Sequence, residues 1–208
     1  MLKHKKLGVI FIDCWDQHWN WQNPGAPHNN FYHNMIDTLS EYDIDSYVFH
    51  NTFLSLKYVT PDVVNYFKEF VNNEPSDSNK RQAVIDLLSA TGTERLTPEL
   101  HTLYENNKSI YIPTFNGFQQ WVQTSGIGRW IVVGAHWGIC THTKPLGFEN
   151  LLIYKKQSPG IKIFSIPSCT AKWTDGPDSG VTICSDIDYA QDHLKWQKVG
   201  DNLQELIL

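Results

Sequence analysis

Two residues of this sequence could together carry out nucleophilic catalysis, an aspartate at position 13 and a cysteine at position 140. Asp13 directly follows the apolar run LGVIFI, and Cys140 follows the run RWIVVGA after the short segment HWGI. A thiol at a helix start lies among unpaired N–H groups, which favour the thiolate and could also hold an oxyanion. A carboxylate beside the thiol could accept its proton. The pair therefore predicts acyl transfer through a covalent cysteine intermediate.

Short apolar runs predict the strands that would position this pair. They are residues 7–12, 46–50, 109–113, 129–135 and 161–167, each rich in β-branched or aromatic residues. Helical spacing of apolar residues is found at 29–42, 60–71, 116–126 and 185–208. Strands that alternate with helices predict a three-layer α/β/α fold with a mostly parallel sheet. We expect residues 1–208 to form one domain of this kind.

The loops after the predicted strands should meet at one edge, because ligands of open α/β sheets bind at the carboxyl ends of the strands. Asp13 and His50 follow the first two strands, and Phe115 belongs to the loop after the third. Residues 134–140 and 167–173 follow the fourth and fifth strands. The topology therefore brings Asp13 and Cys140 into one site.

The sequence resembles the isochorismatase-like cysteine hydrolases, which include nicotinamidases and several amidases. The phrase FIDCWDQHW is similar to the end of their first strand, with Asp13 at the catalytic aspartate. Gly134 and Cys140 reproduce the six-residue spacing between a glycine and the nucleophilic cysteine. SGIGRWIVVG and residues 92–112 are also similar to family segments. The likeness is thin between about 55 and 91 and after Pro167.

The resemblance implies a particular site and activity. Cys140 would be the nucleophile, Asp13 the general base, and the amides of Ile139 and Cys140 the oxyanion hole. A cis peptide bond would join Ala135 to His136. The family implies a roughly six-stranded sheet, a homo-oligomer, and hydrolysis of a small amide or amide-like substrate without a cofactor.

One departure from the family concerns its third catalytic residue, a lysine just after the third strand. Here Ile112 or Pro113 stands at that place, and Lys108 precedes the strand. A cation beside the carboxylate and the thiol stabilises both charged forms, and Lys144 or Lys172 from another loop could supply one. The alternative is therefore a catalytically inactive protein of the same fold, serving as a binding or assembly module.

Other residues have a functional and a structural interpretation. Tryptophans 15, 19, 21 and 137 could line a pocket for a flat substrate, or could serve packing and subunit contacts. His136 flanks the cysteine loop as a wall of the pocket. Asp13 could instead cap a helix, and Cys140 could be an inert buried thiol. The remaining cysteines are expected in the core or in loops; they are Cys14, Cys169 and Cys184.

A metal site has weak support, because neither an HxH nor an HExxH spacing occurs. We expect no metal; if one binds, the candidate ligands are Asp16, His18 and His50.

Composition excludes several classes of partner. The net charge is −5 and the longest basic block is KHKK at the N-terminus, so we expect no nucleic-acid partner. No apolar run approaches the length of a membrane span, and none resembles a secretion signal. The four cysteines form no CxxC pair. Free thiols in a reducing, cytoplasmic compartment are expected.

Overall fold

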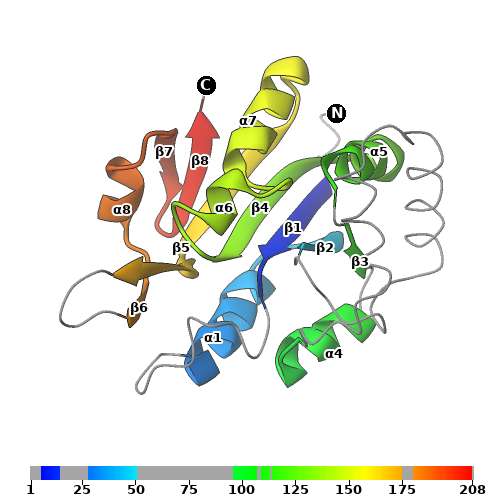
Figure 1. Ribbon diagram of the computed structural model, residues 1–208. Coiled ribbons are helices and arrows are strands. Elements are labelled where there is room, and N and C mark those ends of the chain that lie inside the picture. The colour runs from blue at the N-terminus through cyan, green and yellow to red at the C-terminus, as the bar shows by residue number, and fades with distance from the viewer. Residues whose placement is uncertain are drawn as a thin grey trace, which may run out of the picture.

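The computed structural model describes residues 6–14, 28–50, 96–106, 109–112, 114–174 and 180–207. Strands in this part of the chain form one sheet in the order β3-β2-β1-β4-β5-β8-β7, with β6 pairing β5 (Figure 1). The strands are β1 (Lys6–Ile12), β2 (Ser46–His50), β3 (Ser109–Tyr111), β4 (Ile127–Ala135), β5 (Lys162–Thr174), β6 (Gly180–Ile183), β7 (Lys195–Gly200) and β8 (Leu203–Ile207). The helices are α1 (His28–Ser40), α4 (Pro98–Asn106), α5 (Phe115–Ser125), α6 (Cys140–Thr143), α7 (Phe148–Gln157) and α8 (Asp186–Ala190).

The predicted strands are confirmed as β1 to β5. Each neighbouring pair among them is parallel, from β3 through β2, β1 and β4 to β5. The remaining strands, β6, β7 and β8, are antiparallel to their neighbours. The described sheet thus has eight strands rather than about six, with five of them parallel.

Alternation along the central strand β1 builds the layers of the fold. Val9 and Phe11 belong to the core that includes residues of α1 and α4. Ile10 and Ile12 belong to the core on the other face, under α5 and α7. Figure 1 shows these helix pairs on opposite faces of the sheet. Successive side chains of a strand point to opposite faces, so a continuous apolar run predicts this double coverage. The three-layer α/β/α fold is confirmed.

Helix signals in the sequence correspond to real helices where the chain is described. In α1, Phe31, Met35 and Leu39 are at most 2% exposed, as their spacing predicts. Helix α5 is capped by Thr114, whose hydroxyl accepts a hydrogen bond from the Gly117 N–H at 3.1 Å. The predicted helix 60–71 lies outside the described residues.

The C-terminal expectation was wrong, because residues 185–208 form the short α8 and then the hairpin β7–β8 instead of a helix. Asp201 and Asn202, which follow Gly200 at the end of β7, are turn-forming residues between the two strands. Burial alternates residue by residue along β8, as in a half-buried strand. Strand β8 pairs with the edge of β5 at Phe164 and Ser165.

The segment after the fifth predicted strand also differs. Residues 167–173, expected in the loop after the fifth strand, are part of β5, which continues to Thr174 beyond a register shift opposite Val132 and Gly134. Pro167 cannot donate to a strand partner, which accounts for the break in pairing there. Beyond the break, β6 pairs with β5 on its other side.

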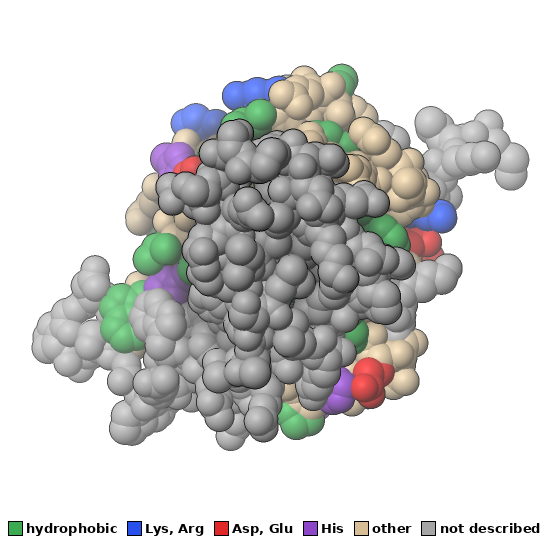
Figure 2. Space-filling model, turned by 45° about the vertical axis from the view of Figure 1, so that its right-hand side comes forward, with side chains coloured by type: hydrophobic (Ala, Val, Ile, Leu, Met, Phe, Trp, Pro, Cys, Tyr) green, Lys and Arg blue, Asp and Glu red, His purple; other side chains and the backbone are tan. Residues whose placement is uncertain are grey.

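Two surface properties bear on partners. None of the described helices is both long enough and apolar enough to cross a bilayer. On the face drawn in Figure 2, the described lysine and arginine side chains lie at separate places around the rim instead of in one patch.

Candidate active site

The end of β1 places Asp13 at the carboxyl edge of the sheet. Its backbone has a φ of 50°, in the left-handed region that non-glycine residues seldom adopt. The Asp13 N–H donates to the carbonyl of His50 at 3.1 Å, so the chain leaves the strand beside the end of β2. The residue is only 4% exposed. A buried carboxylate is costly unless a cation or hydrogen-bond donor compensates it, so its neighbours decide its role.

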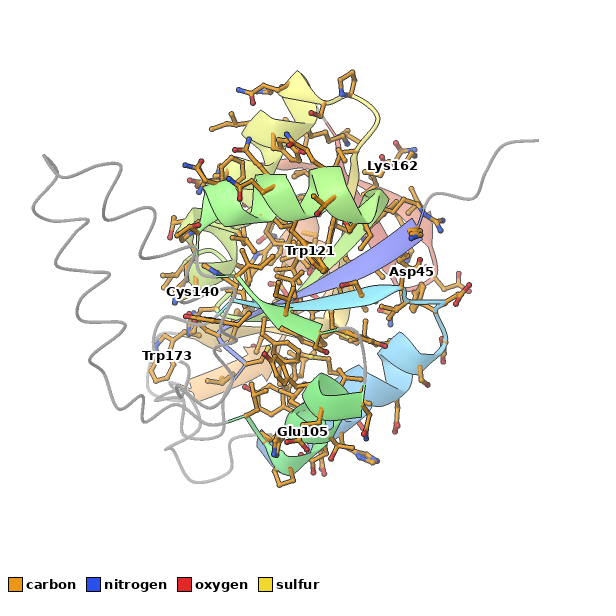
Figure 3. All side chains as sticks on the ribbon, turned by 90° about the vertical axis from the view of Figure 1, so that its right-hand side faces the viewer. Asp45, Glu105, Trp121, Cys140, Lys162 and Trp173 are labelled. Carbon is orange, nitrogen blue, oxygen red and sulfur yellow. The ribbon has the colours of Figure 1, made fainter. Side chains whose placement is uncertain are left out.

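The loop after β4 brings Cys140 to the same edge. In Figure 3, Cys140 and Trp173 lie at the opposite end of the sheet from Asp45 and Lys162. The peptide bond between Ala135 and His136 is cis, as the resemblance predicts. The chain then turns through Gly138, with a φ of 78°, and α6 starts at Cys140.

Helix α6 makes a single turn, which places Lys144 beside the thiol. Its four residues end before Lys144, whose extended backbone (φ −63°, ψ 161°) precedes Pro145. A residue before proline is driven out of the helical region, so Pro145 explains the stop. Residues four apart share a helix face, so Cys140 and Lys144 point to the same side.

An ion pair joins Lys144 to Asp13. The lysine Nζ lies 2.6 Å from Asp13 Oδ1, and the two side chains are 19% and 5% exposed. Asp13 also hydrogen-bonds Cys140, whose pKa responds to both the aspartate and the lysine. The three side chains therefore form one charged cluster. Lys172, the other lysine considered from the sequence, pairs with Asp188 instead.

The thiol of Cys140 is held in its neutral form. Burial first, and then the charge and hydrogen bond of Asp13, raise the pKa of Cys140 to about 11. Lys144 and the backbone N–H of His136 act in the opposite direction and are outweighed. The sequence-based expectation of a favoured thiolate is thus corrected. A helix of one turn has little macrodipole to offset burial and a neighbouring carboxylate.

The two backbone amides expected in the oxyanion hole differ in whether their N–H already donates a hydrogen bond. The N–H of Ile139 donates to the carbonyl of His136 at 3.1 Å, and that of Gly138 donates to His142 Nδ1. No described residue accepts a hydrogen bond from the Cys140 N–H. The Cys140 N–H thus has no acceptor among the described residues, whereas the Ile139 N–H is already bonded to His136.

Two buried histidines border this cluster. His50 Nδ1 donates to the carbonyl of Ile112 at 2.8 Å, and burial lowers the pKa of His50 to about 4. Its other nitrogen has no partner among the described residues. Burial also lowers the pKa of His136, which is 1% exposed and stacks on Trp173. Both rings are therefore neutral near pH 7.

The other residues predicted to line the pocket differ in burial and in their packing partners. Ile139 is 54% exposed beside Cys140, whereas Ala135 is fully buried. Trp137 packs against Tyr189 with 3.9 Å between ring centroids, and also against Trp196. These contacts favour the second of the two interpretations of Trp137, packing, over a place in a substrate pocket. Phe115 starts α5 and meets Tyr154 edge-on.

Several predicted residues lie outside the described part of the chain. They are Trp15, Asp16, His18, Trp19, Trp21, Lys108 and Pro113. Ile112, which stands where the resemblance implies a lysine, is 3% exposed. The other cysteines, Cys14, Cys169 and Cys184, are buried free thiols with raised pKa values, as expected of core residues.

A cluster that sequence analysis missed lies on the far side of the cysteine loop. His142 Nε2 is 2.9 Å from Asp192 Oδ2, and His193 Nδ1 is 3.0 Å from Asp192 Oδ1. Among the described residues, these three make the one group whose spacing could hold a metal ion. His142 and Asp192 are 50 residues apart in the chain, so no local motif signals their contact.

Comparisons with known proteins add a fold likeness. No family model matches the sequence, and no curated protein matches it. Solved structures that resemble it include an isochorismatase from Pseudomonas putida KT2440, at 12% identity and a TM-score of 0.43. That match covers 89% of this chain and 80% of the other. At this level of likeness, nothing about activity follows from it.

Proposed function

We propose that this protein is a cysteine hydrolase of isochorismatase-like type that acts on a small amide or amide-like substrate. The observation that carries the proposal is the contact of Lys144 with Asp13, beside the Cys140 thiol. Lys144, the residue after α6, would supply the cation that the family supplies after its third strand. A carboxylate, a cation and a thiol at one sheet edge are the parts that acyl transfer through cysteine needs.

The acylation step would start from a neutral thiol. Because the pKa of Cys140 is raised to about 11, its proton must leave as the sulfur attacks. Sγ bonds to the substrate carbonyl carbon while Asp13 takes the thiol proton. The carbonyl oxygen becomes an oxyanion at the Cys140 N–H. When the carbonyl re-forms, the C–N bond breaks, and the amine leaves with the proton from Asp13.

The deacylation step would use the same carboxylate. Asp13 takes a proton from water as the water oxygen attacks the thioester, and the C–S bond then breaks. The acid product leaves and Cys140 recovers its proton. Lys144, 2.6 Å from Asp13 Oδ1, would hold the carboxylate in place at the thiol between the steps. His50 and His136, both neutral, would line the site without competing for protons.

The test is hydrolysis of a panel of small primary amides, followed by ammonia release. Wild-type protein should release ammonia from at least one amide, whereas Cys140→Ser and Asp13→Asn should not. Release that survives Cys140→Ser would contradict the proposal. The cytoplasmic setting and the homo-oligomer expected from the sequence remain part of the proposal, and size-exclusion chromatography with light scattering tests the latter.

A second candidate is a catalytically silent module of the same fold. The raised pKa of Cys140 favours it, because a neutral thiol is a poor nucleophile unless a base works with it. Equal, slow alkylation of all four cysteines, with no amide hydrolysed, would support this alternative.

A further inference from the structure

His142 connects the loop that carries Cys140 to the C-terminal segment. The side chain is fully buried. Its Nδ1 accepts a hydrogen bond from the Gly138 N–H at 3.1 Å, and its Nε2 lies 2.9 Å from Asp192 Oδ2. The same Asp192 oxygen accepts the Trp196 indole N–H at 2.8 Å. One imidazole thus joins the turn before the thiol to the residues between α8 and β7.

The contact with Gly138 favours one tautomer of the ring. A backbone N–H can only donate, so Nδ1 carries the lone pair there and the ring proton is on Nε2. The Thr141 hydroxyl, 3.1 Å from the same Nδ1, can donate or accept and so fits this tautomer as well. The Nε2 proton points at the Asp192 carboxylate, which can only accept while it is ionised. Burial alone would raise the pKa of Asp192, but hydrogen bonds from His142 and Trp196 outweigh it and hold the pKa below its usual value. The carboxylate thus orients the ring for Gly138.

We propose that His142, oriented by Asp192, is a positioning residue that holds the turn from Gly138 to Cys140 so that the Cys140 N–H faces the substrate carbonyl. Gly138 is bonded to His142 and Ile139 to His136, which leaves the Cys140 N–H as the donor of this turn with no acceptor among the described residues. The inference rests on the proposed function, because it assigns a use to the Cys140 amide.

A metal ion is the competing occupant of this cluster. His142, Asp192 and His193 have compatible spacing. A metal on His142 Nε2 would leave the ring proton on Nδ1, opposite the Gly138 N–H. Two donors would then face each other at the 3.1 Å contact. The hydrogen-bonded arrangement therefore favours His142 as a clamp, meaning a side chain bonded to both Asp192 and Gly138, over His142 as a metal ligand.

Aromatic side chains shield the hydrogen bonds of His142 from solvent. Trp137 meets the His142 ring edge-on at 4.6 Å between centroids, and Phe148 meets it similarly at 5.5 Å. Hydrogen bonds shielded in this way are stronger, and an unpaired donor among them is more costly.

The chemical test compares two reactions at Cys140. Acylation by p-nitrophenyl acetate passes through an oxyanion, whereas alkylation by iodoacetamide does not. Their rate ratio, after subtraction of the Cys140→Ala background, reports the contribution of the Cys140 N–H. His142→Leu and Asp192→Leu should each lower the ratio roughly tenfold, equivalent to about 1.4 kcal/mol for one lost buried hydrogen bond.

Conservative variants separate positioning from simple packing. His142→Asn keeps an oxygen acceptor near the Nδ1 position, and Asp192→Asn can still present an oxygen to His142. Both should retain most of the wild-type ratio. His193→Gln is the matched control, since His193 contacts the other Asp192 oxygen and is 62% exposed. A ratio that follows thermal stability across all variants, or that is unchanged in both leucine variants, would overturn the proposal.

A spectroscopic reading of the wild-type protein does not depend on chemistry at Cys140. Nitrogen-15 NMR of labelled histidine should show His142 with its proton on Nε2 and with no change on addition of Zn²⁺. A proton on Nδ1, or Zn²⁺-dependent shifts that His193→Gln abolishes, would refute the clamp. A third outcome is the Nε2–H tautomer with no acylation at Cys140. The proposed function would then fail, and the clamp would have no oxyanion amide to position, so its proposed role would be refuted as well.

Discussion

The ammonium group of Lys144 lies 2.6 Å from Asp13 Oδ1, at the carboxylate that also hydrogen-bonds the Cys140 thiol. The lysine directly follows α6, four residues after the cysteine, so one short segment supplies both the thiol and the cation. The carboxylate comes from the neighbouring strand β1.

Replacing Lys144 by methionine should make the thiol less reactive. Lys144 lowers the pKa of Cys140, so the pKa should rise in Lys144→Met. A rise of about one unit leaves roughly tenfold less thiolate near pH 8. The measurement is the rate of Cys140 alkylation by iodoacetamide, read by peptide mass spectrometry. Lys172→Met is the matched control, because Lys172 pairs with Asp188. Equal rates in wild type and Lys144→Met would show that the ion pair does not act on the thiol.

Replacing Asp13 by asparagine should change alkylation and hydrolysis in opposite directions. The charge and hydrogen bond of Asp13 raise the pKa of Cys140, so Asp13→Asn should lower that pKa and speed alkylation near neutral pH. Hydrolysis should nevertheless fall by about 10²–10⁴-fold, because the general base is lost. Stopped-flow alkylation across pH 6–11 and an ammonia-release assay on the same preparation check both effects. Slower alkylation in the variant would argue against this role of the carboxylate.

Protonation of His50 should destabilise the fold at acidic pH. Its pKa is about 4 in the folded protein, against about 6.5 in an unfolded chain. The unfolded state therefore binds more protons between these values, and stability is lost as pH falls from 6.5 to 4. The loss approaches about 3 kcal/mol.

Denaturant unfolding of wild type and His50→Asn over this pH range measures the effect. Asparagine can still donate to the Ile112 carbonyl, and it cannot titrate. The stability difference at pH 8 gives the pH-independent cost of the substitution. From that baseline, the variant should lose less stability than wild type on acidification. A difference that stays constant from pH 8 to 4 would contradict the prediction.

Gly134 is required where β4 meets β1 beneath the site. Its φ is 122°, and a Cβ there would lie 2.1 Å from the Ile12 carbonyl oxygen and 2.9 Å from the Cys14 sulfur. Gly134→Ala should therefore lower the free energy of unfolding by about 2–4 kcal/mol, from strain and steric overlap together. Gly126→Ala is the control, because Gly126 also has a positive φ but nothing within 4 Å. It should cost only about 1 kcal/mol. Equal losses in the two variants would exclude the steric explanation.

Local patterns in the sequence were sufficient to predict the strands that position the site. Continuous apolar runs predicted β1 to β5, and parallel topology then placed Asp13, His50 and Cys140 at one edge. The C-terminal hairpin was missed because KWQKVGDNLQELI also has apolar residues at helical intervals. Only pairing with β5 decides in favour of strands.

Details of the site depend on tertiary structure that the sequence does not reveal. Lys144 could be named as a candidate cation, but choosing it over Lys172 required knowing that α6 ends after one turn. The raised pKa of Cys140 depends on burial, which a helix-start motif does not encode. The contact between His142 and Asp192 has no local signature at all.

The central claim is that Asp13, Lys144 and Cys140 act as one acyl-transfer unit. The most direct measurement is intact-protein and peptide mass spectrometry after brief reaction with p-nitrophenyl acetate and acid quench. We predict one acetyl group, located on Cys140, in wild-type protein, and strongly reduced acetylation in Lys144→Met. In Asp13→Asn the acetyl group should still form on Cys140 but should persist longer once the reagent is removed, because the base for deacylation is lost. Acetylation spread evenly over the cysteines, or undiminished on Cys140 in Lys144→Met, would contradict the claim.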